Sequence, residues 1–129
     1  SKPQLDAPVV DIDLAALRAT AEPGKEIVTT IDVPNTSSVF TVILHKPAEK
    51  NAANYLLELF DAKKPKAVWS AQKKLEAQTK IAVTLAKRNY PAGKYRFTLS
   101  GVEGKKKELL ETYQIEVKYQ PPPKQKKKK

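Results

Sequence analysis

The sequence predicts an all-β fold, an antiparallel β-sandwich of seven or eight strands followed by a disordered basic C-terminal tail. The clearest observation is residues 90–101, where a Pro and a Gly mark a turn and apolar and polar residues then alternate. Such alternation is typical of a half-buried strand. It recurs along the chain, and turn residues separate the alternating segments. We therefore expect one sandwich domain at residues 8–119, after a loose lead-in at 1–7 and before a Pro/Lys-rich tail at 120–129.

The N-terminal half contains three predicted strands. Apolar residues alternate with two aspartates over residues 10–14, which predicts the first strand, and residues 22–24 form a turn signal. Alternation over residues 27–33 predicts the second strand. The run at residues 39–44 is apolar on both faces except for Thr41, which is typical of a strand buried on both sides.

The middle of the chain predicts two further strands and one ambiguous segment. Residues 55–61 alternate, residues 63–65 form a basic turn, and residues 67–69 begin a shorter strand. Residues 75–87 are the only serious helix candidate, because Ala, Lys, Leu and Gln favour helices. Their apolar side chains nevertheless fall at every odd position from 75 to 85, so we predict a strand here too.

The C-terminal part completes the predicted sandwich. The strand after residue 93 leads to a turn at residues 101–105, and alternation over residues 113–119 predicts the last strand. Three prolines at residues 121–123 then stop it, because proline cannot donate to a strand ladder.

Charge and cysteine content exclude several kinds of function. The chain has no cysteine, which excludes disulfides, thiolate metal sites and cysteine nucleophiles. Half of its net charge of +10 belongs to the tail, since without the tail lysines 19 basic residues face 14 acidic ones. These lysines would bind phosphate-rich surfaces through counterion release. They are Lys124, Lys126, Lys127, Lys128 and Lys129.

No catalytic, cofactor-binding or metal-binding residue is predicted. His45 is the only histidine, and we interpret it as a surface residue at a strand end, since no second His or Cys accompanies it. Asp11 and Asp13 would share one strand face, but no acidic loop completes a calcium site, so we interpret them as exposed.

Aromatic and basic side chains leave two alternatives open. Trp69, Tyr90 and Tyr119 form either part of the core or a platform for sugars or nucleic-acid bases. Further lysines extend a polyanion-binding patch if their loops share one end of the sandwich. They are Lys63, Lys64, Lys66, Lys73, Lys74, Lys105, Lys106 and Lys107.

Residues 85–97 resemble the E–F corner of an immunoglobulin-like sandwich. In that corner a Gly precedes a Tyr by two positions, and the Tyr hydroxyl bonds to upstream backbone. Gly93 and Tyr95 occupy these positions here, so the resemblance implies that Tyr95 pins the corner. Phe97 lies where antibody-type domains have a cysteine, which implies an apolar plug in place of a disulfide.

A second resemblance is to the extracytoplasmic β-sandwich of bacterial membrane-anchored zinc-finger anti-sigma proteins. That family has a Leu-Pro-x-Gly-x-Tyr turn, a strand with Leu, a Gly after it and a closing Tyr-x-Phe/Ile-x-Val strand. The chain contains neither the family's His/Cys zinc module nor its membrane helix, so the resemblance implies only the ectodomain's role, sensing or protein contact outside the cytoplasm. The matching residues are Pro91, Gly93, Tyr95, Leu99, Gly101, Tyr113, Ile115 and Val117.

These observations lead to one functional expectation and one alternative. We expect a non-catalytic interaction or sensory module, the extracytoplasmic domain of a larger bacterial membrane protein, which binds a protein partner and needs no cofactor or small-molecule substrate. The alternative is a protein that binds nucleic acid or an anionic membrane through its lysine-rich tail.

Overall fold

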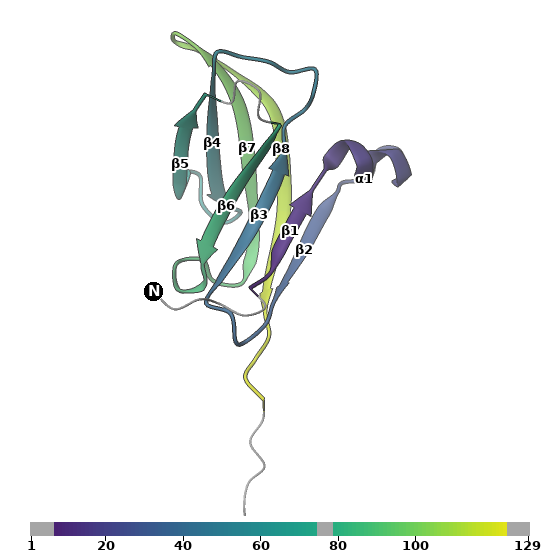
Figure 1. The fold of residues 1–129 in the computed structure, drawn as a ribbon, viewed down its shortest axis with the longest axis vertical. Helices are drawn as coiled ribbons and strands as arrows, with labels where there is room; N and C mark the ends of the chain where they lie inside the picture. Colours follow the sequence, from purple (N-terminus) through teal and green to yellow (C-terminus); the bar gives the residue numbers. More distant parts are fainter. Residues whose placement is uncertain (1–6, 75–78, 124–129) are drawn as a thin grey trace, which may run out of the picture.

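Two β-sheets face each other in the computed structural model, which describes residues 7–74 and 79–123 (Figure 1). One sheet has three strands in the order β1 (Val9–Ile12), β3 (Val39–His45) and β6 (Lys80–Ala86). The other has five strands in the order β2 (Val28–Val33), β8 (Lys106–Tyr119), β7 (Gly93–Glu103), β4 (Asn54–Asp61) and β5 (Trp69–Lys73). The predicted all-β sandwich is confirmed.

The hydrophobic core fills the space between the two sheets. Each central strand alternates buried and partly exposed residues, so every second side chain points inward. The predicted inward positions of β7 are confirmed, because Tyr95, Phe97 and Leu99 are all buried. The largest fully buried side chains are Tyr113, Phe40, Phe97, Ile12, Ile31, Leu44, Leu59, Leu99 and Ile115, with Val33 and Val42.

The first predicted strand is wrong at its end, where a helix begins. β1 stops at Ile12, and α1 (Leu14–Thr20) follows it. The side chain of Asp13 caps this helix by accepting a hydrogen bond from the backbone N–H of Ala16 (3.2 Å). The residues after Leu14 are mostly Ala, Leu and Arg, which are strong helix formers. The period-two pattern of residues 10–14 therefore extended two residues beyond the end of β1.

The ambiguous segment at residues 75–87 is a strand where the structure describes it. β6 spans Lys80–Ala86, and its side chains alternate between the core and solvent. A short 3₁₀ helix, η1 (Lys87–Asn89), follows. The part of this prediction at residues 75–78 lies outside the described residues. Tertiary burial of alternate side chains has overridden the helix propensity of the segment.

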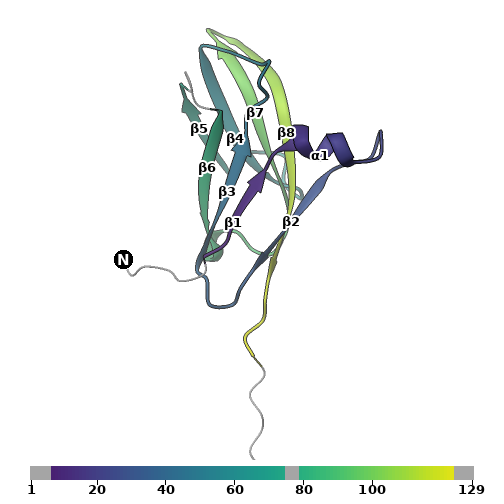
Figure 2. The same cartoon turned by 45° about the vertical axis from the view of Figure 1, so that its right-hand side comes forward.

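Two strand pairs are parallel, which the sequence did not predict. β1 pairs with β3, and β2 pairs with β8, both in parallel register. The segment with α1 reverses the direction of the backbone between β1 and β2, and it connects the two sheets. β1 can therefore run in the same direction as β3, and β2 in the same direction as β8. Figure 2 shows α1 projecting from the side of the sandwich at this reversal.

The ends of the chain lie partly outside the described residues. The predicted lead-in at residues 1–7 and the tail lysines at 124–129 fall there, except for Ala7, and residues 120–123 have no regular secondary structure. Within residues 7–74 and 79–123, no helix is long and apolar enough to cross a membrane.

The loop between β3 and β4 packs closely on β7 at Gly101. A Cβ atom at this glycine would lie 2.9 Å from the Cβ of Ala52, which is closer than side-chain carbons normally approach. Only a glycine leaves room for this contact.

The corner before β7 contains the hydrogen bond that the sequence predicts. The hydroxyl of Tyr95 donates to the carbonyl of Pro91 at 2.6 Å, and burial raises the pKa of Tyr95, with smaller contributions from Asp61 and Tyr90. Gly93, which begins β7, has a φ of +153°, a value that other residues rarely adopt. The ring of Tyr95 also meets that of Tyr90 edge to face, with centroids 6.1 Å apart.

Changing Tyr95 to Phe is expected to lower the free energy of unfolding by about 1 kcal/mol, because it removes one hydrogen bond from a buried ring. Urea denaturation followed by far-ultraviolet circular dichroism would measure the loss. The matched control is Tyr90→Phe, since no hydrogen bond of the Tyr90 hydroxyl is found among the described residues. An equal effect of both substitutions would contradict the corner assignment.

Candidate functional site

An apolar groove of about 300 Å³ lies between β5 and β6, and we call it the edge groove. In Figures 1 and 2 these two strands run side by side at the border of the sandwich that is opposite to α1. Tyr55, Leu57 and Leu99 from the neighbouring strands of the five-stranded sheet also line it. Its two walls are Trp69, Ala71 and Lys73 from β5, and Ile81, Val83 and Leu85 from β6.

The groove exists because β5 and β6 are end strands of different sheets. β5 pairs only with β4, and β6 pairs only with β3, so within the described residues each strand has one edge with no partner strand. Such an edge presents unpaired backbone N–H and C=O groups, which can pair with another strand. The inward side chains of β6 line the groove because no strand pairs with β6 on this side.

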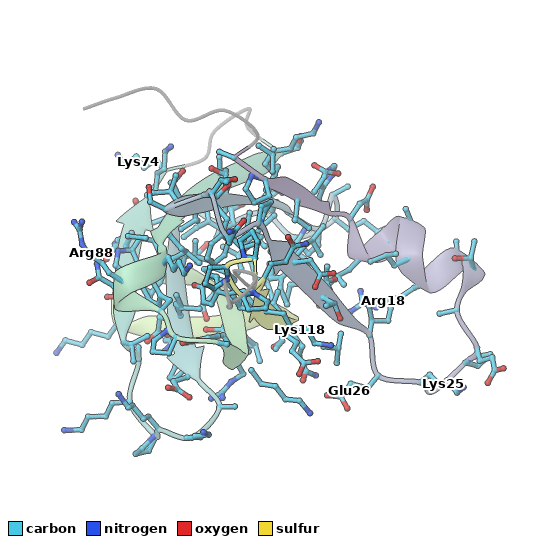
Figure 3. All side chains as sticks on the ribbon, turned by 90° about the horizontal axis from the view of Figure 1, so that it is seen from below. Arg18, Lys25, Glu26, Lys74, Arg88 and Lys118 are labelled. Carbon is cyan, nitrogen blue, oxygen red and sulfur yellow. The ribbon has the colours of Figure 1, made fainter. Side chains whose placement is uncertain are left out.

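Both walls of the groove belong to segments that contain cations and no acids. Residues 62–74 and 79–89 include no Asp or Glu. Lys73, Lys74 and Lys80 are exposed at one end of the groove, and Lys87 and Arg88 lie at the other end, after β6. Figure 3 shows Lys74 and Arg88 on the same side of the molecule, with Lys25 on the far side. The groove is therefore an apolar surface in a positive environment.

His45 has partners that sequence reasoning missed. Its Nε2 atom lies 2.8 Å from a carboxylate oxygen of Asp11, and its Nδ1 atom lies 3.7 Å from a carboxylate oxygen of Asp13. The parallel pairing of β1 with β3 brings these residues together, since Asp11 pairs with Ile43 in register. His45 ends β3 as predicted, but its side chain is only 22% exposed and is paired, so it is not a free surface residue.

This cluster fastens β1 and the start of α1 to the end of β3. The backbone carbonyl of His45 also accepts a hydrogen bond from the buried hydroxyl of Tyr113 in the opposite sheet. Over residues 7–74 and 79–123, no group of three or more His, Cys, Asp or Glu side chains could hold a metal ion. The contacts of the cluster account for a structural role.

The three aromatic residues do not form one platform. Trp69 and Tyr90 both line the edge groove, whereas Tyr119 packs edge to face on Phe40 with ring centroids 6.3 Å apart. The hydroxyl of Tyr119 donates to the backbone carbonyl of Tyr90. All three are partly buried against the core. Trp69 is thus a wall of the groove and the only tryptophan of the chain.

The burial of Tyr119 predicts a loss of stability at alkaline pH. Burial, with a smaller contribution from Tyr95, raises the pKa of Tyr119 to about 12. In the unfolded chain this pKa is about 10, so ionisation favours the unfolded state once the pH exceeds about 10. The contribution of Tyr119 is therefore complete below about pH 10 and is lost as the pH approaches about 12.

Urea denaturation at a series of pH values, in the wild type and in Tyr119→Phe, would test this. All other titratable groups are the same in the two proteins, so the difference between the two curves isolates Tyr119. We expect the unfolding free energy of the variant to fall less steeply above pH 10. Parallel curves would show that Tyr119 ionises equally in both states.

The lysines expected to extend a basic patch are divided between the two ends of the sandwich. Asp61 pairs with Tyr95, and Gly93 pairs with Val117, so the β4–β5 turn, η1 and the start of β7 share the end from which the chain leaves β8. Lys105, Lys106 and Lys107 lie in the β7–β8 hairpin at the opposite end, together with Lys73 and Lys74. We call the end with the β4–β5 turn, η1 and the start of β7 the basic end. Its cations are Lys63, Lys64, Lys66, Lys87, Arg88 and Lys94.

The cations of the basic end have no acidic partner in the described part of the chain. None of the six makes an ion pair among residues 7–74 and 79–123. Lys87 instead lies over the ring of Tyr119, with its Nζ atom 5.3 Å from the centroid. In contrast, Lys107 at the opposite end pairs with Glu58 at 2.7 Å.

A second hollow, of about 690 Å³, lies between α1, the α1–β2 loop and β8. Arg18 lines it and binds both carboxylate oxygens of Glu111, at 2.8 and 2.9 Å, and this contact raises the pKa of the guanidinium. Figure 3 shows Arg18 on the side where the loop with Lys25 and Glu26 bends around α1. Because the guanidinium is already paired, this hollow offers no free charge from Arg18 to a ligand.

Comparison with known proteins does not assign the chain to a family. The chain matches no protein-family model, and no curated protein is detectably similar to it in sequence.

Proposed function

We propose that this chain is a non-catalytic interaction module that binds a protein partner at the edge groove. The observation that supports this best is an apolar groove between two strand edges, neither of which has a partner strand among the described residues. Proteins commonly bind extended segments by adding a strand to such an edge. The resemblance of residues 7–119 to the ectodomain of anti-sigma proteins favours the same kind of role, in an extracytoplasmic domain of a larger bacterial membrane protein.

Site-directed photocrosslinking would test the proposal in cells that produce the protein. Ala71 lines the groove and is exposed, so p-benzoylphenylalanine at this position would react with a bound partner. Ala19 is exposed on α1, on the opposite side of the sandwich, and is the matched control (Figure 1). We expect a discrete protein adduct from position 71 that position 19 does not give. Identical adducts at both positions, or none at position 71, would contradict the proposal.

A second candidate function is the binding of a polyanion at the basic end. The unpaired cations there lie beside the end of β8, after which the tail lysines Lys124 and Lys126–Lys129 follow in the sequence. Clustered cations bind phosphate-rich surfaces, and salt weakens this binding.

The test compares the full chain with a chain that ends at Pro123, in binding to duplex DNA and to anionic vesicles at low and high salt. A large, salt-sensitive loss of binding on truncation would support the tail as the anion-binding segment. A further loss of binding when Lys63→Glu is added to the chain that ends at Pro123 would show that the basic end takes part. Absence of binding by the full chain at low salt would exclude this function.

A further inference from the structure

We propose that the edge groove takes an extended segment of the partner in which apolar and acidic residues alternate, and that this segment pairs as a new strand with β6. This inference rests on the proposed function and specifies the chemistry of the partner.

The free edge of β6 suits an added strand better than that of β5. β6 has seven residues, all of which pair with β3 on the other side, so its backbone is held extended and straight. Apart from Lys80 at its start, its outward side chains Ala82, Thr84 and Ala86 are small, and Thr84 is already hydrogen-bonded to Thr41 (2.8 Å). Small side chains beside an edge leave room for the side chains of an incoming strand.

The inward side chains of β6 define what the new strand must present. Ile81 is partly buried, and Val83 and Leu85 are buried at 7% and 3% exposure, yet all three line the open groove. A strand paired with β6 would point every second side chain between β6 and Trp69. Apolar side chains at these alternate positions would cover the remaining apolar surface of the groove, which favours binding.

The charges around the groove specify the other set of side chains. All charged residues in the described segments on both sides of the groove are cations. Lys73 lies in one wall, and Lys80 lies at the start of the other. Acidic side chains at the intervening positions would complement them, and such complementarity raises both specificity and the association rate.

The same charges disfavour a second copy of this chain as the occupant. Antiparallel pairing of β6 with the same strand of another copy would place Lys80 of each copy near Lys87 of the other. Lysines on edge strands are a common protection against self-pairing. An acidic segment of a different protein meets no such repulsion.

The experiment titrates the full chain with a synthetic peptide of alternating Val and Glu that has the length of β6, at low salt. Trp69 reports binding directly, because it is the only tryptophan and forms a wall of the groove. We expect a saturable change in its fluorescence, and slower amide hydrogen exchange in β6 on addition of the peptide. A peptide of alternating Val and Lys should bind at least about tenfold more weakly.

Two charge variants locate the site. The double variant Lys73→Glu/Lys80→Glu should weaken binding by about tenfold or more, because both lysines are exposed beside the groove. The double variant Lys25→Glu/Lys118→Glu makes the same change of net charge at exposed lysines away from the groove and should leave affinity within about twofold. Circular dichroism would verify that both variants fold.

The remaining outcomes overturn the inference and leave the proposed function to its own test. Equal binding of the Lys peptide would exclude selection for acidic segments, and binding without a change at Trp69 or in β6 would place the peptide elsewhere. A dimer found by sedimentation, together with a change in Trp69 fluorescence as the chain dimerises, would identify a second copy as the occupant. If the peptide does not bind but position 71 still crosslinks a partner, the module binds a segment of other chemistry. If both fail, the edge groove is not a binding site.

Discussion

Replacing Phe97 by Ala is expected to lower the free energy of unfolding by about 3–5 kcal/mol. The side chain of Phe97 has no solvent exposure and lies in the middle of β7, where it pairs in register with Tyr113 on one side and Leu59 on the other. All three side chains are fully buried, so the cavity left by the ring has well-packed walls that cannot easily close it. A loss of this size is a large share of the stability of an ordinary domain.

Urea denaturation would measure this loss, and two substitutions would serve as controls. Thr98→Ala alters the opposite face of the same strand, where the side chain is partly exposed, and should cost less than about 0.5 kcal/mol. Phe97→Leu keeps an apolar side chain and should cost less than half as much as Phe97→Ala. If Phe97→Ala cost no more than Thr98→Ala, Phe97 would not have the role of an apolar plug.

Replacing Lys46 by Met is expected to cost about 2 kcal/mol, because it removes hydrogen bonds made by a buried charged group. Lys46 is only 8% exposed. Its ammonium group donates to the carbonyls of Pro47 and Lys50, both at 3.0 Å, and to the side-chain oxygen of Asn51 at 3.1 Å. These contacts use all three donors of the ammonium, and Met would leave the three acceptors without this donor.

The matched control for this prediction is Lys50→Met, which removes an exposed ammonium four residues away and keeps the backbone carbonyl that Lys46 binds. We expect no measurable change in the unfolding free energy from it. In Lys46→Met, amide hydrogen exchange should also quicken at Ala52, whose N–H donates to the hydroxyl of Tyr55 at 2.8 Å within the same loop. Similar stability of both variants would show that solvent replaces the lost hydrogen bonds.

Local patterns predicted the strands of the sandwich because burial of alternate side chains is visible in the order of residues. Residues 80–86 show this best, since their period-two pattern outweighed a composition that favours a helix. The corner at Tyr95 was also predictable, because it depends on residues close in sequence. The pattern was misleading at Leu14, which fits both a strand and the first turn of a helix. The signal for the helix was Asp13, a preferred capping residue, directly before Leu-Ala-Ala-Leu-Arg-Ala.

The candidate site was much less predictable than the fold. Trp69 and Val83 line one groove only because their strands end different sheets, and no local pattern specifies which strands become edges. His45 meets Asp11 through a parallel pairing that follows from the direction change at α1. Lys46 resembles any surface lysine in the sequence, although the loop after it folds around its ammonium group. All of these depend on contacts between distant or irregular segments.

The parallel pairing of β2 with β8 has a consequence for the order in which the domain can be made. On the ribosome β2 emerges early, but its only partner in the sheet is the last strand of the domain, with Val33 opposite Tyr119. Closing so long a loop is slow, so we expect β2 to remain unpaired until synthesis of the domain is nearly complete. A nascent chain that stops before β8 should therefore expose residues 28–33 to chaperones and proteases, and the final strand should act as the step that commits the domain to its native state.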